Sequence, residues 1–288
     1  MRPDRPADAR RSFPMHLGNV HPKNPTARRE FAGLVLSDSH YPGRLRQPRH
    51  GHEPASFSLV LEGGYSETVA LKTFDCRPAT VIFRPPDETH SVAFADAPVR
   101  IFRLDVRPQW LERFGLSQTG APAAAAGGPR AWLALRLYRE MQEADEFSPL
   151  AVEGLALELW AETARESARE ASARPPRWVE RAREMLREQQ PAGALTLGEI
   201  AAEVGVHPSR LAHEFRRCYR VTAGEYLRRL RVERAAHALA ASALSLSEVA
   251  AAAGFYDQSH MTNAFKRATG ATPAEYRAAF RAAQSRPS

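Results

Sequence analysis

Residues 195–226 and residues 244–276 of this chain are two copies of one segment. Matching residues lie 49 positions apart in the first part of each copy and 50 positions apart in the second part. The matched pairs include Leu195 and Leu244, Glu199 and Glu248, Gly205 and Gly254, Phe215 and Phe265, and Tyr226 and Tyr276. The offset changes in the turn after the glycine, where chains tolerate insertions best. A repeat of this kind predicts the same small helical unit twice.

Each copy contains two matching helix-start signals. In a capping box, a Ser or Thr side chain accepts a hydrogen bond from the backbone amide three residues further on. The carboxylate of a Glu at that second position accepts a hydrogen bond from the backbone amide of the Ser or Thr. Pro273 also stands at the first helical position, where proline is favoured. The four candidate boxes are Thr196 with Glu199, Thr222 with Glu225, Ser245 with Glu248, and Thr272 with Glu275.

Between its two boxes, each copy shows the pattern of a short helix, a glycine and a second helix. The short helices end at Gly205 and Gly254, at places that often need a left-handed backbone. The inward residues of the second helices are Leu211 and Phe215 in one copy, and Met261 and Phe265 in the other. This pattern predicts two helix-turn-helix units, in which the second helix can lie in the major groove of DNA.

The outward sides of these second helices carry residues that suit DNA. Compact donors and acceptors near a helix N-terminus suit base edges, whereas the basic residues further along suit phosphates. The alternative is an ordinary polar surface, and the duplication favours DNA. The outward residues are Ser209, Arg210, Ala212, His213, Arg216 and Arg217 in the first copy, and Gln258, Ser259, Thr262, Asn263, Lys266 and Arg267 in the second.

The distribution of charge also favours a polyanion as partner of the C-terminal third. The chain has a net charge of +7. Residues 178–288 hold 16 Arg or Lys and 11 Asp or Glu, whereas residues 1–177 hold 24 and 22. No apolar run approaches the ~18 residues that span a bilayer, and the N-terminus lacks the apolar stretch of a signal peptide. We therefore expect a cytoplasmic protein, in which Cys76 and Cys218 form no disulfide framework.

The rest of the chain divides by composition. Residues 1–30 are rich in Pro, Arg and Ala and predict a mobile N-terminal arm. Residues 31–110 contain short apolar runs broken by Gly and Pro, which predict a small antiparallel β-barrel or sandwich. The expected strands are 57–64, 66–74, 79–85 and 99–106.

Residues 111–171 form a helical segment in this interpretation. A flexible stretch is expected at 120–128, followed by helices that are interrupted at Ser148 and Pro149. The apolar stripes of these helices belong either to the core or to a dimer contact. Paired prolines make 172–177 a linker. The repeat-containing domain then occupies residues 178–282, and residues 283–288 form a tail.

With these residues in hand, the sequence GFYDQSHMTNAFKRATGATPAEYR (254–277) resembles the signature of the AraC/XylS family of bacterial transcription regulators. The resemblance covers about residues 178–282. It implies that one monomer places both units on one face of DNA, about one helical turn (~34 Å) apart. The implied partners are double-stranded DNA, a small-molecule effector and RNA polymerase. Family members often carry Arg where this chain has Asn263, and Asn suits adenine better than guanine.

The arrangement of His50, His52 and His90 resembles the small cupin barrel that many regulators of this family use as a sensor, and cupin enzymes often bind a metal through such histidines. Such histidines can bind a divalent metal, or they can line the pocket of an organic ligand. The glutamate that completes a cupin metal site would fall near Ser56 or Phe57, so it is predicted to be absent. The glutamates in this region with the wrong spacing are Glu53, Glu62 and Glu67.

The expected fold is a multidomain α+β chain, with a cupin-like β-barrel, a helical segment and an all-α double helix-turn-helix. The expected function is that of a sequence-specific DNA-binding transcription regulator controlled by a small molecule, with no catalysis and no required cofactor. The alternative is a metal-dependent cupin enzyme or a metal sensor fused to a DNA-binding domain.

Overall fold

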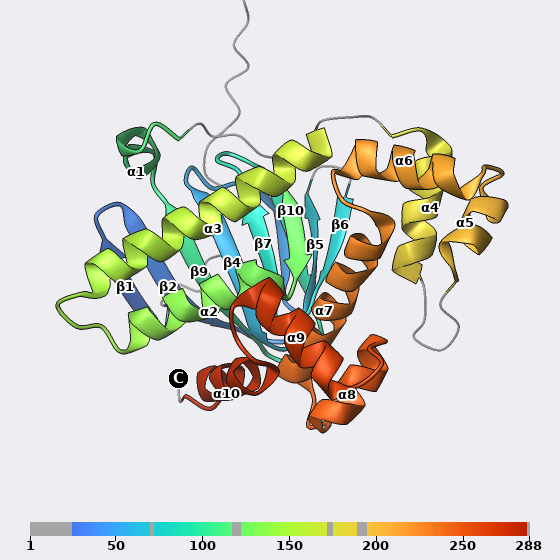
Figure 1. Ribbon diagram of the computed structural model, residues 1–288. Helices are drawn as coiled ribbons and strands as arrows, with labels where there is room; N and C mark the ends of the chain where they lie inside the picture. Colours follow the sequence, from blue (N-terminus) through green and yellow to red (C-terminus); the bar gives the residue numbers. More distant parts are fainter. Residues whose placement is uncertain (1–24, 70–71, 117–121, 172–174, 189–194, 287–288) are drawn as a thin grey trace, which may run out of the picture.

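Figure 1 shows a computed structural model of the chain, which describes residues 25–69, 72–116, 122–171, 175–188 and 195–286. The N-terminal part consists of strands and a helical pair, and the C-terminal part is helical. The strands are β1 (Ala27–Phe31), β2 (Leu34–Tyr41), β3 (Arg46–His50), β4 (Ala55–Glu62), β5 (Tyr65–Val69), β6 (Lys72–Cys76), β7 (Thr80–Arg84), β8 (His90–Phe94), β9 (Val99–Val106) and β10 (Ala123–Ala126). The helices are α1 (Pro108–Arg113), α2 (Gly128–Gln142), α3 (Ser148–Ala171), α4 (Arg177–Glu188), α5 (Leu197–Glu203), α6 (Pro208–Tyr219), α7 (Ala223–Ala241), α8 (Leu246–Ala253), α9 (Gln258–Thr269) and α10 (Pro273–Gln284).

The strands form two antiparallel sheets. The larger sheet has the order β1-β2-β9-β4-β7-β10, and the smaller has the order β3-β8-β5-β6. Side chains from both sheets share a small core that includes Val60, Ile82, Val92 and Ile101. Among the described residues the two sheets do not join edge to edge, so the cupin-like domain is an open sandwich, one of the two antiparallel forms that the sequence predicted.

Several strands differ from the sequence-based prediction. The run 66–74, predicted as one strand, forms part of β5 and part of β6, which pair with each other. Residues 27–30, predicted as part of the arm, belong to β1 and pair with β2; residues 1–24 of the predicted arm lie outside the described residues. The stretch 123–126, predicted as flexible, is β10 and pairs with β7. Backbone pairing, not side-chain preference, holds these polyalanine residues in a strand.

The helical pair covers the outer face of the larger sheet. The break predicted at Ser148 and Pro149 is confirmed, because α3 begins at Ser148. The apolar stripes of α2 and α3 pack into the core of their own chain, where Tyr138 and Leu159 are almost fully buried. These stripes therefore form the intramolecular core.

The repeated segment folds as two helix-turn-helix units joined by the long helix α7. All four predicted capping boxes form, at the starts of α5, α7, α8 and α10. Gly205 and Gly254 both have left-handed backbones, with φ of 71° and 84°. Among the described residues, no helix is long and apolar enough to cross a membrane.

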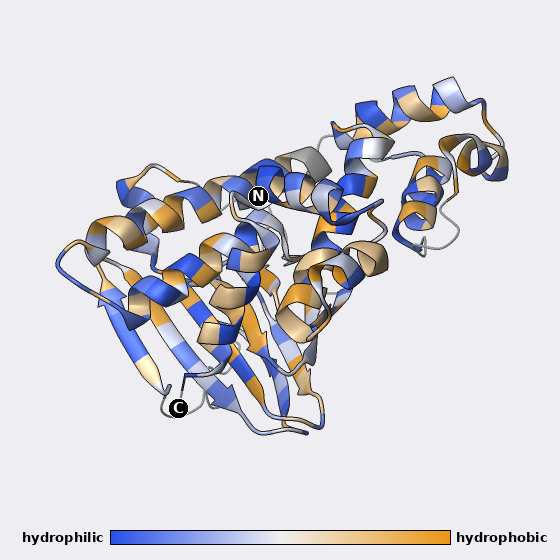
Figure 2. Ribbon diagram, turned by 60° about the horizontal axis from the view of Figure 1, so that its bottom comes forward, coloured by the Kyte–Doolittle hydropathy of each residue, from blue (hydrophilic) through white to orange (hydrophobic). Residues whose placement is uncertain are grey.

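The two units differ in how they attach to the rest of the chain. The first, with α4, α5 and α6, has a core of its own around Leu211 and Phe215, and Figure 2 shows it projecting as a separate lobe. The second, with α8, α9 and α10, shares the main core with α2 and the larger sheet through Met261, Phe265 and Phe280. The second unit is therefore packed into the core of the N-terminal domain, whereas the first unit has a separate core and contacts that domain where α6 meets α3.

Candidate nucleic-acid interface and sensor pocket

The second helix of the first unit, α6, presents the side chains that the sequence predicted. Its inward residues Leu211, Phe215 and Cys218 are buried. The predicted contact residues Ser209, Arg210, Ala212, His213, Arg216 and Arg217 are all exposed. Two of the arginines have partners within the chain. Arg217 forms an ion pair of 2.7 Å with Glu214, and the Arg210 guanidinium lies 5.7 Å from the centroid of the Trp178 ring.

The corresponding helix of the second unit, α9, follows the same plan. Met261, Ala264 and Phe265 are buried. Of the predicted contact residues, Thr262 is half-buried, and the exposed ones are Gln258, Ser259, Asn263, Lys266 and Arg267. The two helices thus share the residues that fold them and differ in the polar side chains that they present.

Sequence periodicity missed residues just outside each helix. His207 caps α6, and its Nδ1 accepts a hydrogen bond from the backbone amide of Ser209. Tyr256, in the turn before α9, is 93% exposed. His260 is exposed near the start of α9, with its ring 5.3 Å from that of Phe255. His207 and Tyr256 lie in the turns before α6 and α9, outside both helices, so no helical spacing could mark them.

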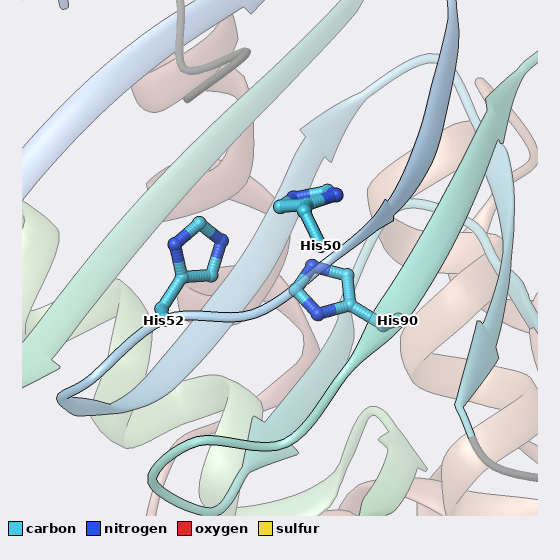
Figure 3. Close-up of side chains that lie close together, drawn as sticks. All are labelled: His50, His52 and His90. Atoms are coloured by element: carbon cyan, nitrogen blue, oxygen red, sulfur yellow. The ribbon is translucent and has the colours of Figure 1, made fainter. Parts of the chain in front are cut away.

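The three histidines of the cupin-like domain come together in space (Figure 3). His50 ends β3, His52 lies in the loop after it, and His90 begins β8, which pairs with β3. Their ring centroids are 4.4 to 5.2 Å apart, and one nitrogen of each lies within 4.8 Å of the others. The sheet pairing therefore creates a site from residues 40 positions apart in sequence.

Backbone carbonyls and a buried ion pair surround this cluster. Nδ1 of His50 lies 2.7 Å from the Pro48 carbonyl oxygen, which leaves Nε2 as the nitrogen that can bind a ligand. The buried carboxylate of Glu67 accepts two hydrogen bonds of 2.5 Å from Arg84 and lies 4.0 Å from Nε2 of His90. Burial, together with the nearby Arg84 guanidinium, lowers the pKa of His90 to about 4. His90 is therefore neutral near pH 7.

The position of Glu67 corrects one conclusion drawn from its spacing. The sequence excluded it as a neighbour of the histidines, yet β5 pairs with β8 and brings Glu67 beside His90. Its carboxylate is held by Arg84, so it does not stand free as a fourth ligand. The cavity around the cluster has an open volume of only about 30 Å³. Its polar lining includes Gln47, Ser58 and Tyr65.

Two family models match the chain. The model described as "AraC-like ligand binding domain" matches residues 31–160, and the model described as "Helix-turn-helix domain" matches residues 200–279. Together they cover most of the chain in the order that the structure shows. The chain belongs to the AraC family of transcriptional regulators.

Relatives of this AraC-family chain match it over part of its length. The uncharacterized HTH-type transcriptional regulator YijO of Escherichia coli K12 is 35% identical over 86 residues, 30% of each protein. The arabinose operon regulatory protein of the same organism is 32% identical over 82 residues, 28% of each protein. The matched region thus spans less than a third of each relative.

Two solved structures are also similar to this chain. The C-terminal domain of AraT, a response regulator from Geobacillus stearothermophilus, is 29% identical, with a TM-score of 0.35 over 37% of this chain and 88% of that one. An apo ToxT variant from Vibrio cholerae is 11% identical, with a TM-score of 0.40 over 88% of this chain and 100% of that one.

In this AraC-family chain, a buried polar cluster joins the sensor domain to the second unit. Arg100, on β9, donates hydrogen bonds to Asp38 on β2 and to the Tyr138 hydroxyl on α2. The same guanidinium donates to the carbonyl oxygens of Ala283 and Arg286 at the end of α10, at 2.9 and 3.0 Å. A cation at a helix C-terminus is favourable, because the last carbonyls lack partners. We call this set of five residues the Arg100 clasp.

The Arg100 clasp changes the interpretation of the predicted tail. Residues 283 and 284 continue α10, and Gln284 donates hydrogen bonds to the carbonyl oxygens of Leu61 on β4 and Ala240 on α7. His237 on α7 adds a contact of 2.6 Å to the Pro78 carbonyl oxygen. The end of the second unit is therefore attached to the sensor domain at several places.

Proposed function

We propose that this protein is a sequence-specific DNA-binding transcription regulator whose helices α6 and α9 each enter a major groove. The observation that carries the proposal is a pair of matched units with the same caps and cores but different exposed faces. Identical faces would fit a symmetric site, whereas different faces suit an asymmetric one. DNA as the target places the protein in the cytoplasm, and we assign it no catalytic role.

The two helices carry two kinds of contact in this proposal. Asn263 and Ser209 lie in the N-terminal halves of their helices, from which base edges are commonly read. Lys266 and Arg216 lie in the last turns, where long cations suit phosphate oxygens. Tyr256, exposed beside the start of α9, is a further candidate for a contact to the DNA backbone.

Substitution of Asn263 and of Lys266 tests this division directly. We expect Asn263→Ala to relax discrimination at one base pair, at a cost of about 1–3 kcal/mol on the preferred site. Lys266→Ala should weaken binding to all sequences alike. It should also make the slope of log affinity against log salt concentration shallower by about 1, the share of one phosphate contact. Binding to a panel of single-base-pair site variants distinguishes the two. Equal effects of both changes on every variant would contradict the assignment.

We further propose that a small molecule bound by the sensor domain controls DNA binding, with His50, His52 and His90 as its candidate ligand residues. An effector regulates only if it binds two conformations unequally. The Arg100 clasp supports such coupling, because it joins β2 and β9 of the sensor to the end of α10. RNA polymerase and a second copy of the chain are further partners in this proposal.

The alternative is that the effector is a divalent metal ion. The convergence of three imidazoles, with His90 neutral near pH 7, suits such an ion, and the narrow cavity leaves little space for a larger molecule. His50, His52 and His90 would hold the ion, which would supply a charged link between β3 and β8. The ion pair with Arg84 keeps Glu67 out of the ligand set.

Metal analysis of the purified protein tests this alternative. A metal sensor should contain one zinc, nickel or other divalent ion per chain, and His50→Ala or His90→Ala should reduce the content to below about one tenth. His260→Ala, which changes an exposed histidine on α9, should leave the content unchanged. Protein that is free of stoichiometric metal after purification without chelators would rule the metal out and favour an organic effector.

A further inference from the structure

The hydroxyl of Ser209 is held by the histidine that caps its own helix. Nδ1 of His207 lies 2.7 Å from Oγ of Ser209 and 3.3 Å from the backbone nitrogen of the same residue. Both residues are exposed, so packing does not fix the direction of the hydroxyl. Within the part of the chain that the structure describes, the imidazole is the one hydrogen-bond partner of this hydroxyl.

The positions of the protons follow from these two contacts. A backbone N–H can only donate, so Nδ1 of His207 accepts from the amide of Ser209 and carries no proton. A ring nitrogen without a proton cannot donate to the hydroxyl, so at 2.7 Å the hydroxyl donates to Nδ1. The neutral ring then carries its proton on Nε2. The single hydrogen of the Ser209 hydroxyl is therefore used within the protein.

This hydrogen bond restricts what Ser209 can bind. Its oxygen offers only lone pairs to a DNA base, so it can accept a hydrogen bond and cannot donate one. At their major-groove edges, adenine and cytosine carry amino groups that donate, whereas guanine and thymine carry only acceptors. An acceptor placed opposite the Ser209 oxygen would leave both groups unpaired, which costs affinity.

The second copy of the repeat lacks this arrangement. Ser259 matches Ser209, 50 positions on, and Asp257 matches His207. The Asp257 side chain caps α9 by accepting a hydrogen bond of 2.7 Å from the backbone amide of His260. Among the described residues, the hydroxyl of Ser259 has no hydrogen-bond partner. Ser259 can therefore donate or accept, whereas Ser209 can only accept.

We propose that His207 is a positioning residue that makes Ser209 an acceptor, so that α6 selects a base with an amino group, adenine or cytosine, at one position of the DNA site. This inference rests on the proposed function, because it requires α6 to lie in a major groove. It extends that function by naming the chemical class of base that Ser209 recognises. His207 acts through Ser209 and needs no contact of its own with the DNA.

Selection from a randomised library of DNA duplexes, with the full chain and with Ser209→Ala, locates the base pair that Ser209 faces. That base pair is the one at which the preferences of the two proteins differ. We expect the unaltered chain to accept adenine or cytosine there and to bind the guanine and thymine versions about three- to tenfold more weakly. Adenine and cytosine form this pair because the amino group is the donor that they share at the major-groove edge.

His207→Asn removes the imidazole and keeps a cap, since an amide oxygen can accept from a backbone amide as the Asp257 carboxylate does. The Ser209 hydroxyl is then free to rotate and donate. We expect the affinity for the guanine and thymine versions to rise to within about twofold of the other two, whose affinity stays unchanged. Ser209→Ala should instead lower the affinity for the adenine and cytosine versions. Asp257→Asn is the matched control and should leave the preference at this base pair unchanged.

Three results would each overturn the inference: a preference for guanine or thymine at this base pair, no base pair whose preference Ser209→Ala changes, or an equal loss of affinity for all four versions in His207→Asn. Arg216→Ala separates these results from a failure of the proposed function, since it should weaken binding to all sequences alike. If it does so and one of the three results is found, this inference alone is contradicted. If Arg216→Ala changes binding to no sequence, α6 does not contact DNA, and the proposed function fails together with this inference.

Discussion

Replacing Arg100 by Met should lower the free energy of unfolding by roughly 3–5 kcal/mol, the usual cost of removing one partner of a buried ion pair. The Asp38 carboxylate, 1% exposed, would remain buried without its cation. The carbonyl oxygens of Ala283 and Arg286 would also lose their donor. Urea unfolding measures the change. Since the clasp holds α10 on the sensor, the variant should also show earlier proteolytic cleavage within the second unit.

Two further variants separate this effect from ordinary loss of a charge. Arg44→Met removes an exposed ion pair with Asp96, whose side chains are 80% and 85% exposed, and should cost less than about 1 kcal/mol. The double variant Asp38→Leu with Arg100→Met removes both buried charges and should recover a large part of the lost stability. If Arg100→Met costs no more than Arg44→Met, the clasp does not stabilise the docked second unit.

Replacing Gly127 by Ala should have the next largest effect, because it pushes the connecting helix α7 away from the sensor. A Cβ atom at Gly127 would lie 2.3 Å from the Cβ of Ala236 on α7, far inside a normal contact. The residue also has φ of 65°, which side chains rarely adopt. The substitution should lower the free energy of unfolding by two contributions: about 1–3 kcal/mol from the strained backbone and a similar amount from overpacking against α7.

Gly128 provides a matched control for the Gly127 substitution. Its φ is 69°, yet a Cβ added there meets nothing within 4 Å. Gly128→Ala should therefore show the backbone strain alone and leave the contact with α7 unchanged. The two variants are compared by urea unfolding and by DNA binding. Equal losses in both assays would mean that close packing of α7 on the sensor does not position the two units.

The C-terminal half of this chain could be predicted closely from sequence because its signals are local. A capping box needs a Ser or Thr three residues before a Glu, and all four predicted boxes form. The exposed faces of α6 and α9 followed from the helical spacing of Leu211, Phe215, Met261 and Phe265.

The N-terminal half was predicted less completely because its structure depends on pairing between distant residues. Strand β10 is polyalanine, and β3 contains a proline and four charged or polar residues, so neither has the apolar alternation that marks a strand. Glu67 reaches His90 only through the register of β5 with β8. Arg100 binds a carbonyl 183 residues away. No spacing rule covers such contacts.

The proposed function requires that two different helices of one chain, α6 and α9, read DNA, and a change in the spacing of the DNA site tests this most directly. Once a preferred site is known, five base pairs are inserted between its two halves, which rotates one half by about half a helical turn. We expect one of the two helices to lose its contact with the DNA, with a fall in affinity of at least about tenfold. If α9 loses its contact, Asn263→Ala should no longer change the affinity for the altered site. If α6 loses its contact, Arg210→Ala should no longer change it. An affinity that is unchanged by the insertion, with both variants still lowering it, would contradict the claim that α6 and α9 both read the DNA site.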